Sequence, residues 1–477
     1  MTKTNERGPD LFFTLLFLVI IFVTGIHWLI LALRIPVLDV LPYWKFVLHV
    51  IPINPLWIAL AFIAFSLAVT VSFINIDYAI KLIALVLLGT AIQFSFAYSK
   101  GQGLDGIRNR IVELGHAEFA NVAVEQPGVL FALQNYEILA KNEHYGYIPS
   151  KPPGTLLFYM LTDKVSNIFS PASVSRSDKL ENLRTFASIA WPAISYFVVI
   201  PLYYLARELF KNSQTAITTS LFYITIPSVN LITLHTDQVI YPFLAVVPVL
   251  MAVIAFRKGS IWFAVLCGLG VYLAVYFSFG LAVIGFLLLV PTLIAIPENS
   301  FRPFVYSLKY GVIIMIAGLL SNILAYSILN YNIVDRYTKA INHHLHWKVW
   351  ENRLGTYLRA GITDMAEFSV WFGLPLTILF FICICVSIHQ FIVRNPNVAS
   401  FYNAALVGIF VFLLVFGRTK AETARLWLFL VPFICISVAN FINQQNWTSR
   451  SKIAFTIMIL LLEIGTTYFT LRYQDFN

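Results

Sequence analysis

Charged residues are scarce in this chain. Asp, Glu, Lys and Arg make up 12% of its 477 residues, whereas soluble domains carry roughly 25%. Hydrophobic residues account for 59% of the chain and aromatic residues for 16%. This balance excludes an ordinary soluble enzyme and indicates a polytopic membrane protein.

The net charge does not point to nucleic acid. The formal charge is +9, but the basic residues are not gathered in a soluble module, as nucleic-acid binding would require. At a membrane, the same excess of Lys and Arg favours anionic lipid headgroups or phosphate-bearing lipid substrates. We therefore expect membrane lipids as partners and no nucleic acid.

Cysteine is equally rare. The four cysteines, Cys267, Cys383, Cys385 and Cys435, all lie in apolar runs, where a thiol behaves as a small buried hydrophobe. No disulfide framework or metal cluster follows from them. The sequence also has no fixed-period repeat, no low-complexity tract and no separate soluble segment at either end. We expect residues 1–477 to form a single transmembrane catalytic domain.

Long apolar runs dominate what is present. Thirteen windows are long enough to cross a bilayer as helices, since a span needs about 17 to 25 residues. They predict an all-α transmembrane bundle with about thirteen spans. The first window is too long for the core of a signal peptide, so we expect a retained anchor. The windows are Leu11–Arg34, Pro55–Asn75, Ala79–Tyr98, Thr185–Ala206, Ala216–Leu234, Val239–Phe256, Ile261–Tyr276, Gly280–Ile296, Gly311–Asn330, Phe368–Phe391, Tyr402–Phe416, Leu426–Phe441 and Ile453–Tyr473.

Lys and Arg in the short loops predict the orientation. A cytoplasmic N-terminus places most basic short loops in the cytoplasm and the longer segments on the external face. The first external loop is expected to carry amphipathic surface helices at Leu104–Val124 and Val129–Lys141, followed by an interfacial helix at Thr155–Phe169. The external segments are residues 99–184, 331–367 and 417–425.

Groups that can do chemistry concentrate between Gly115 and Thr155, in the stretches GHAEF and SKPPGT. His116 or Glu118 could take a proton from an acceptor hydroxyl, because partial burial raises the pKa of a carboxyl group. Lys151 could neutralise a phosphate, with the two following prolines fixing the backbone that presents it. The alternative is a set of ordinary solvated loop residues with a helix-stopping proline pair.

Two further turns carry charge at the ends of apolar runs. Asp237, next to His235 and Gln238, is costly there unless it is paired, hydrated or functional; alternatively it caps the following helix. Arg425 enters a span directly, and an Arg can bind phosphate through two hydrogen bonds; alternatively it snorkels to the membrane surface.

Isolated histidines and acids invite other interpretations. His343, His344 and His346 could bind a metal, but none are spaced i, i+4 on a helix, so an interfacial belt with Trp347 is the alternative. His27 and Glu463 lie within apolar runs. By default such residues indicate functional sites, although each could simply hydrogen-bond a neighbouring helix.

Together these pieces resemble the GT-C superfamily of membrane glycosyltransferases, which includes the aminoarabinose-to-lipid-A transferases and the protein O-mannosyltransferases. HAEFANVAVE, from His116 to Glu125, is similar to the acidic motif early in the family's large external loop. SKPPGTLLFYM, from Ser150 to Met160, is similar to the later Pro-Pro motif that leads into a helix. The resemblance implies transfer of a sugar from a polyprenyl-phosphate carrier to a lipid, glycan or protein acceptor, usually with inversion.

The chain departs from the family where an Asp-Glu or Asp-x-Asp pair is common, because it reads His116-Ala117-Glu118 there. The resemblance then implies Glu118 as the base, with His116 assisting and Asp237 as a second acid. The incomplete pair weakens the case for a divalent cation, Mg or Mn. The lipid phosphate would then be bound by Lys151, Arg425 and Lys420. The residues expected to support these groups are Glu422, His235 and Gln238.

Two other functions remain open from the sequence. In a transporter or lipid flippase, Asp237, His27 and Glu463 would mark a passage through the bundle. In a membrane acyltransferase, His343 or His344 would act together with Asn342. Most polar groups lie in the expected external loops, which favours the glycosyltransferase over the transporter.

Overall fold

The computed structural model describes residues 11–101, 103–113, 117–142, 146–170, 175–232, 237–291 and 301–474. Within these ranges the chain is helical, and the only extended pairing is an isolated antiparallel bridge between Leu48 and Gln474. The predicted all-α class is confirmed.

Nine helical stretches in the described ranges are long and apolar enough to cross a membrane. The chain is therefore an integral multi-pass membrane protein. The fourth stretch, Arg176–Phe210, joins two helices, α9 and α10, end to end. The spanning elements are α1 (Leu11–Leu33), α2 (Pro55–Phe73), α3 (Tyr78–Ser99), α9 (Arg176–Phe197), α10 (Val199–Phe210), α13 (Tyr241–Lys258), α17 (Phe301–Leu329), α20 (Leu374–Ile392), α21 (Val398–Phe416) and α24 (Ser449–Tyr473).

The other four predicted windows form shorter or interrupted helices, so the count of thirteen stays a prediction. One becomes a single helix of 17 residues, α14, and the remaining three are broken by turns or 3-10 segments. The elements are α14 (Ile261–Phe277), α11 (Ser213–Tyr223) with α12 (Pro227–Leu231), η4 (Phe279–Ile284) with α15 (Gly285–Leu288), and α22 (Thr423–Leu426) with η6 (Leu428–Leu430) and α23 (Val431–Gln444).

The break between α11 and α12 shows how an apolar run is interrupted. Pro227 has no N–H for a helical bond and stands at the start of α12. The carbonyls that the break frees are bonded by Asn230, whose Nδ2 donates to Ile224 O at 2.9 Å and to Ile226 O at 3.0 Å. Gln93 on α3 likewise donates to Val229 O at 2.9 Å. Buried amides therefore satisfy the backbone at this turn.

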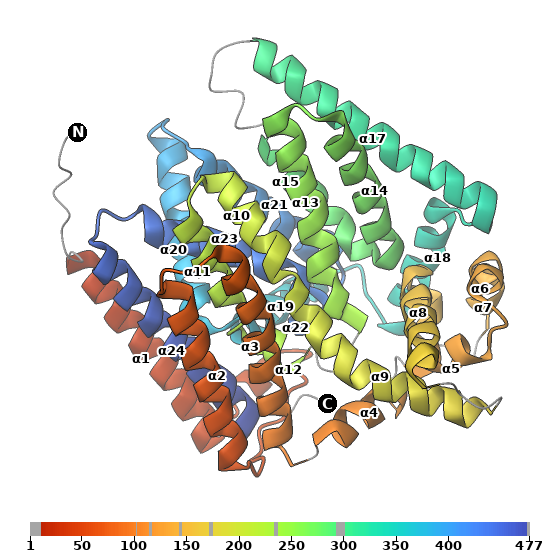
Figure 1. The fold of residues 1–477 in the computed structure, drawn as a ribbon, viewed down its shortest axis with the longest axis horizontal. Helices are drawn as coiled ribbons and strands as arrows, with labels where there is room; N and C mark the ends of the chain where they lie inside the picture. The colour runs from red at the N-terminus through yellow and green to blue at the C-terminus, as the bar shows by residue number, and fades with distance from the viewer. Residues whose placement is uncertain are drawn as a thin grey trace.

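The long helices lie side by side in the bundle, with α1, α2, α3 and α24 together and α13, α14 and α17 together (Figure 1). The contact between α14 and α17 needs a small residue, because a Cβ on Gly268 would lie 2.4 Å from Ile314 O. Such close backbone approach is typical of helices packed in membranes.

Shorter helices gather at one end of the bundle (Figure 1). The expected surface helices of the first loop correspond to α4 (Gly103–Glu113), α5 (Ala117–Glu125), α6 (Val129–Gln134) and α7 (Tyr136–Leu139), and the expected interfacial helix to α8 (Gly154–Phe169). The second expected loop forms α18 (Ile333–Trp347) and enters α19 (Leu354–Phe372). The assignment of these segments to the external face stays a prediction.

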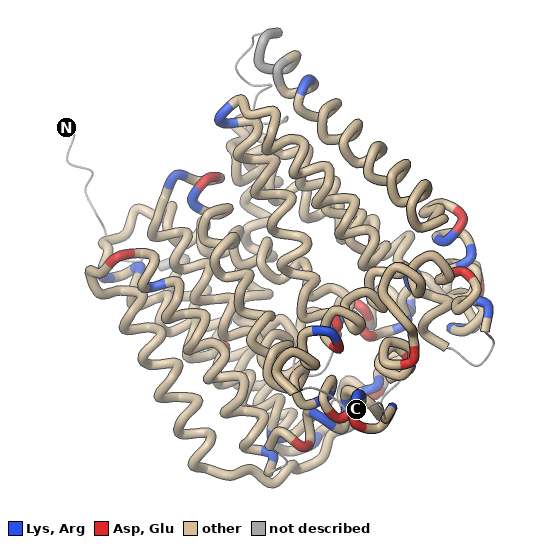
Figure 2. Tube along the Cα trace, turned by 45° about the vertical axis from the view of Figure 1, so that its right-hand side comes forward, with Lys and Arg blue, Asp and Glu red and all other residues tan. Residues whose placement is uncertain are grey.

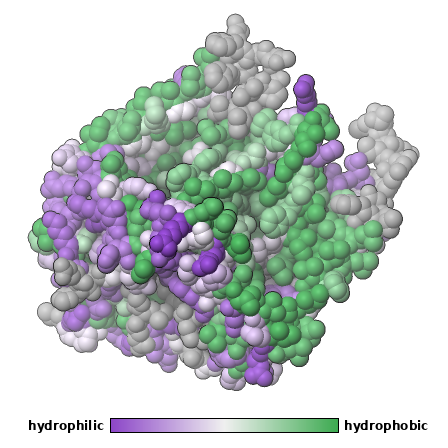
Figure 3. Space-filling model, turned by 180° about the vertical axis from the view of Figure 1, so that it is seen from behind, coloured by the Kyte–Doolittle hydropathy of each residue, from purple (hydrophilic) through white to green (hydrophobic). Residues whose placement is uncertain are grey.

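The charged residues are distributed in the same way as the long and short helices. Lys, Arg, Asp and Glu lie mainly at the ends of the long helices and among the short helices of this end (Figure 2). Seen from behind, hydrophilic residues gather on one side of the surface, while hydrophobic residues cover much of the rest (Figure 3). The face seen in Figure 3 is therefore mostly apolar, and many of the charged residues lie among the short helices at one end.

Candidate functional site

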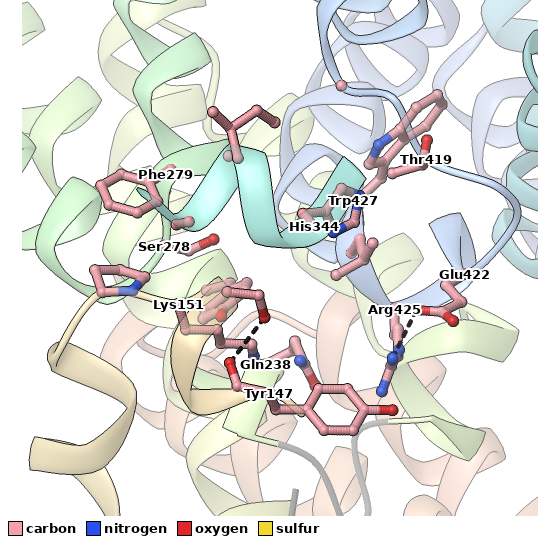
Figure 4. A pocket seen from close by; sticks show the side chains of 18 of the residues that line it. Tyr147, Lys151, Gln238, Ser278, Phe279, His344, Thr419, Glu422, Arg425 and Trp427 are labelled. Carbon is pink, nitrogen blue, oxygen red and sulfur yellow. Dashed lines mark hydrogen bonds and ion pairs between the residues drawn. The ribbon is translucent and has the colours of Figure 1, made fainter. Parts of the chain in front are cut away.

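A cavity of about 210 Å³ opens among the short helices. Its wall brings together five segments that are far apart in the sequence (Figure 4). They are the loop before α8, the turn before α13, the start of η4, one face of α18, and residues from the end of α21 to η6. The polar and charged side chains in the wall are those of Tyr147, Ser150, Lys151, Gln238, Tyr241, Ser278, Tyr337, His344, Lys348, Thr419, Glu422 and Arg425.

Lys151 and Asp237 form an ion pair at the edge of this cavity. The Nζ of Lys151 lies 3.1 Å from Asp237 Oδ2, and the two side chains are 14% and 2% exposed. Thr155 and Tyr241 place their hydroxyl oxygens 3.5 Å from the same carboxylate oxygen. Burial lowers the pKa of Lys151, while Asp237 acts in the opposite direction. The two residues are 86 positions apart in the sequence, and the fold makes them neighbours.

The backbone around Lys151 is held from two sides. The hydroxyl of Tyr136 lies 3.1 Å from Ile148 O and 3.0 Å from Lys151 O. Gly154 at the start of α8 leaves no space for a side chain, because a Cβ there would lie 2.4 Å from Tyr276 O. The SKPPGT stretch is therefore a rigid turn packed against the end of α14.

Glu118 contributes to the same turn through the backbone. Its Oε2 accepts from Gly146 N at 2.9 Å, and its Oε1 accepts from Tyr147 N at 2.6 Å and from Ile148 N. Burial raises the pKa of Glu118, and these three hydrogen bonds oppose that shift. Glu118 is not in the cavity wall. This geometry favours a positioning role, and its role as the catalytic base stays a prediction.

Arg425 and Glu422 face the cavity as a second ion pair (Figure 4). Arg425 Nη2 donates to Glu422 Oε2 at 2.7 Å, and both side chains are 18% exposed. Glu422 Oε1 also lies 2.7 Å from Lys348 Nζ and 2.6 Å from Lys45 Nζ. Burial acts to raise the pKa of Glu422, but the three cations outweigh it and hold that pKa well below its usual range. Three positive groups around one carboxylate leave an excess of positive charge at the cavity.

Two carboxylates on α19 hold this turn in place, and the sequence analysis did not single them out. Asp364 accepts from Ala421 N at 2.9 Å and from the Thr419 hydroxyl. Glu367 accepts from Glu422 N and from Ala424 N, both at 2.8 Å. The sequence does show that the two acids are spaced i, i+3 and so share one helix face. The backbone N–H groups that they bind lie more than 50 residues away in the sequence.

Burial strongly perturbs both of these acids. It raises the pKa of Asp364 to about 8 and that of Glu367 to about 7, against the opposing effect of their hydrogen bonds. Both groups lie on α19, outside the nine candidate spans.

A buried arginine, also missed from the sequence, ties α18 to the SKPPGT turn. Arg336 is 2% exposed, and its Nη2 donates to Pro149 O at 2.8 Å. His343 Nε2 lies 3.0 Å from Gly146 O. The helix that supplies His344 and Lys348 to the cavity is therefore fixed to the loop that supplies Lys151.

The other residues predicted for the site do not all line the cavity. Gln238 lies in the cavity wall. Lys420 does not: its Nζ donates to Lys348 O at 2.9 Å and to Val349 O at 2.7 Å, which ties its turn to the end of α18. His116 and His235 lie outside the described residues.

The donor set at the cavity does not fit a divalent cation. The two nearest carboxylates, Asp237 and Glu422, are already paired with ammonium or guanidinium groups, whose positive charge opposes a second cation. Among the described ranges, no three His, Cys, Asp or Glu side chains converge as a metal site would require. The histidines of α18 face separate carbonyls, with His344 Nε2 3.2 Å from Arg418 O.

The two residues that the sequence singled out within apolar runs, His27 and Glu463, do not line this cavity. Glu463 is fully buried in α24, and its Oε1 accepts from Leu376 N at 2.9 Å, at the start of α20. Gly373 has to be small there, because its φ is +100° and a Cβ would meet the Glu463 carboxylate. His27 is 5% exposed on α1. Glu463 thus has a structural partner at the start of α20.

The fold is similar to that of the archaeal oligosaccharyltransferase AglB from Archaeoglobus fulgidus, a GT-C membrane glycosyltransferase, at low sequence identity. Its structure in complex with an inhibitory peptide and a dolichol-phosphate matches 87% of this chain and 55% of its own, with a TM-score of 0.46 and 14% identity. The A. fulgidus oligosaccharyltransferase structure with Zn and sulfate matches 68% of this chain and 44% of its own, with a TM-score of 0.40 and 15% identity. The chain thus spans about half the length of the structures it matches. No protein-family model and no curated protein sequence matches it.

Proposed function

We propose that this protein is an integral-membrane glycosyltransferase that moves a sugar from a polyprenyl-phosphate carrier to an acceptor hydroxyl, with inversion. The observation that carries the proposal is the joint presence of Lys151, Arg425 and Lys348 in one cavity at the polar end of an apolar bundle. A lipid phosphate lies at the same boundary between polar and apolar surroundings, and Arg and Lys are its usual ligands.

Arg425 and Lys151 would stabilise the departing phosphate. As the bond between the anomeric carbon and the phosphate oxygen breaks, the electron pair stays on that oxygen, and negative charge builds up there. Arg425 is held toward the cavity by Glu422 at 2.7 Å, so it need not reorganise when the charge develops. Such preorganised stabilisation can be the largest contribution to lowering a barrier.

Asp237 does not itself line the cavity, but it pairs with Lys151 in the cavity wall, and we assign it to receive the acceptor's proton. In the free protein, its pairing with Lys151 at 3.1 Å favours the ionised form that a base requires. A bound phosphate gives Lys151 a second anion, which weakens its hold on Asp237 and raises the proton affinity of that carboxylate. The acceptor oxygen would then bond the anomeric carbon while its proton passes to Asp237. Glu118 would keep the loop of Lys151 in position.

The alternatives make different predictions for the same cavity. His344 lies in its wall, and burial lowers the pKa of His344, so this imidazole is neutral near pH 7 and available to an acyltransferase. In that case His344→Ala would abolish transfer of an acyl group while Asp237→Asn would spare it. A flippase would move lipid without forming a covalent product.

Proteoliposomes containing the full chain, a polyprenyl-phosphate sugar labelled in the sugar, and a membrane extract that supplies lipid, glycan and protein acceptors test the proposal. We expect label to appear in a new covalent product and free polyprenyl phosphate to accumulate, and both to be lost in Arg425→Met. Lys211→Met, which changes an exposed residue far from the cavity in sequence, serves as the control. Label that crosses the membrane without covalent transfer would refute the glycosyltransferase and support the flippase.

A further inference from the structure

Gln238 is a buried cavity residue whose side chain has no hydrogen-bond partner among the described residues. It follows Asp237 in η3 (Asp237–Ile240), and its side chain forms part of the cavity wall. The residue is 0% exposed. Neither its Nε2 nor its Oε1 has a hydrogen-bond partner among the residues that the structure describes.

Burying a carboxamide without partners is unfavourable, because its hydrogen bonds to water are lost and not replaced. Gln93 offers a comparison within this protein: it is also 0% exposed, and its Nε2 donates to Val229 O at 2.9 Å. Gln238 has no such backbone partner in the described chain. Its position in a cavity wall therefore indicates that a polar group of a ligand completes its hydrogen bonds.

The surroundings of Gln238 indicate which group this is. Its side chain lines the same cavity as those of Lys151 and Arg425 (Figure 4), the two cations assigned above to the phosphate. A carboxamide offers two N–H donors and one acceptor oxygen, whereas a phosphate offers only acceptors and is matched by the cations. Hydroxyl groups both donate and accept, so a sugar hydroxyl close to the phosphate suits the carboxamide.

We propose that Gln238 hydrogen-bonds hydroxyl groups of the transferred sugar next to its phosphate, and so selects which sugar the protein accepts. This inference rests on the proposed function, which requires a glycosyl group but does not say which residue recognises it. A site built to hydrogen-bond a hydroxyl discriminates strongly against ligands that lack it, because its own polar groups are then left unpaired.

Soluble probes test this role without knowledge of the natural donor. Binding of inorganic phosphate and of the 1-phosphates of glucose, mannose, galactose and N-acetylglucosamine to the detergent-purified full chain is measured by calorimetry. We expect the wild type to bind at least one sugar phosphate about tenfold more tightly than inorganic phosphate, a difference typical of one or two hydrogen bonds to a ligand. Gln238→Met, which keeps the side-chain length, should remove that preference and leave the Kd of inorganic phosphate unchanged.

A matched substitution separates recognition from stability. Gln93→Met removes a buried amide that has a partner, so it should lower the Tm and keep the sugar preference. Gln238→Met should not lower the Tm, and Gln238→Leu provides a second variant of different shape.

Each other outcome has a defined meaning. The role of Gln238 is overturned if the wild type shows no preference among the probes, if Gln238→Met keeps the preference, or if both Gln238 variants lose as much stability as Gln93→Met. If the wild type binds no phosphate-bearing probe at all, the phosphate site fails, and the proposed function fails with it. If the wild type binds inorganic phosphate but shows no preference for a sugar phosphate, only the role of Gln238 fails.

Discussion

Breaking the ion pair between Lys151 and Asp237 should destabilise the protein more than breaking an ion pair at its surface. The two side chains are 14% and 2% exposed and lie 3.1 Å apart. Removing one partner of a buried pair leaves an uncompensated charge and costs about 3–5 kcal/mol. We therefore expect Lys151→Met and Asp237→Asn each to cost on the order of 3 kcal/mol, toward the lower end because the lysine keeps some contact with solvent.

The double variant provides the sharper test. With both charges gone, no unpaired charge remains, so Lys151→Met with Asp237→Asn should cost about 2 kcal/mol less than the sum of the two single variants. The control is Lys211→Met, whose pair with Glu208 is short at 2.6 Å but has a lysine that is 62% exposed. Exposed pairs of this kind contribute about 0.2–1 kcal/mol.

Thermal unfolding of the purified full chain, followed by tryptophan fluorescence, measures these differences. The reasoning is refuted if either single variant has a Tm as close to the wild type as Lys211→Met has, or if the costs of the two single variants simply add in the double variant. Both single variants should also lose transfer activity, because each removes a group assigned to the reaction.

Three further predictions follow from neighbouring groups. Burial raises the pKa of Asp364 to about 8 and that of Glu367 to about 7, so the folded protein keeps protons that the unfolded chain has released. The Tm should therefore fall as pH rises from about 5 to 9. If the dependence of the Tm on pH is unchanged in Asp364→Asn and Glu367→Gln, this explanation is contradicted. Glu118→Gln should lower transfer at least about tenfold, because it weakens the bonds to Gly146, Tyr147 and Ile148. A pH–rate profile of unchanged shape supports the positioning role of Glu118, whereas loss of its acidic limb shows that Glu118 is the base. Since Asp237 and Glu422 are paired with cations, EDTA should leave activity intact, and restoration by Mg or Mn after chelation would show that a metal takes part.

The spanning helices were largely predictable because they depend on local sequence. Runs such as Pro55–Asn75 and Tyr402–Phe416 are apolar throughout and correspond to α2 and α21. The interruption inside Ala216–Leu234 was harder to predict, because a Pro in an apolar run can either kink a transmembrane helix or end it. Here α12 begins at Pro227, and the amides that satisfy the break come from distant Gln93 as well as from Asn230.

The site was predictable as a set of residue types and not as a set of contacts. Lys151, Gln238, Glu422 and Arg425 were all named from the sequence as parts of a site, and the structure brings all four to one cavity. The three backbone donors to Glu118 lie 28 to 30 residues further along the chain. Their convergence depends on the fold of the whole loop, which spacing alone does not reveal.

The buried side chains that hold distant turns in place were missed for the same reason. Asp364 and Glu367 lie more than 50 residues from the turn that they hold, and Arg336 lies 187 residues from Pro149. Each of these side chains is ionisable and almost fully buried, and that burial becomes visible only once the helices are packed.

A structure of the full chain with polyprenyl phosphate bound, determined by cryo-electron microscopy, tests the central claim most directly. The account predicts the phosphate within hydrogen-bond distance of Arg425 and Lys151, with Asp237 facing the side from which an acceptor would approach. A phosphate bound elsewhere, with the Lys151–Asp237 and Arg425–Glu422 pairs undisturbed and the cavity unoccupied by the lipid, would contradict it.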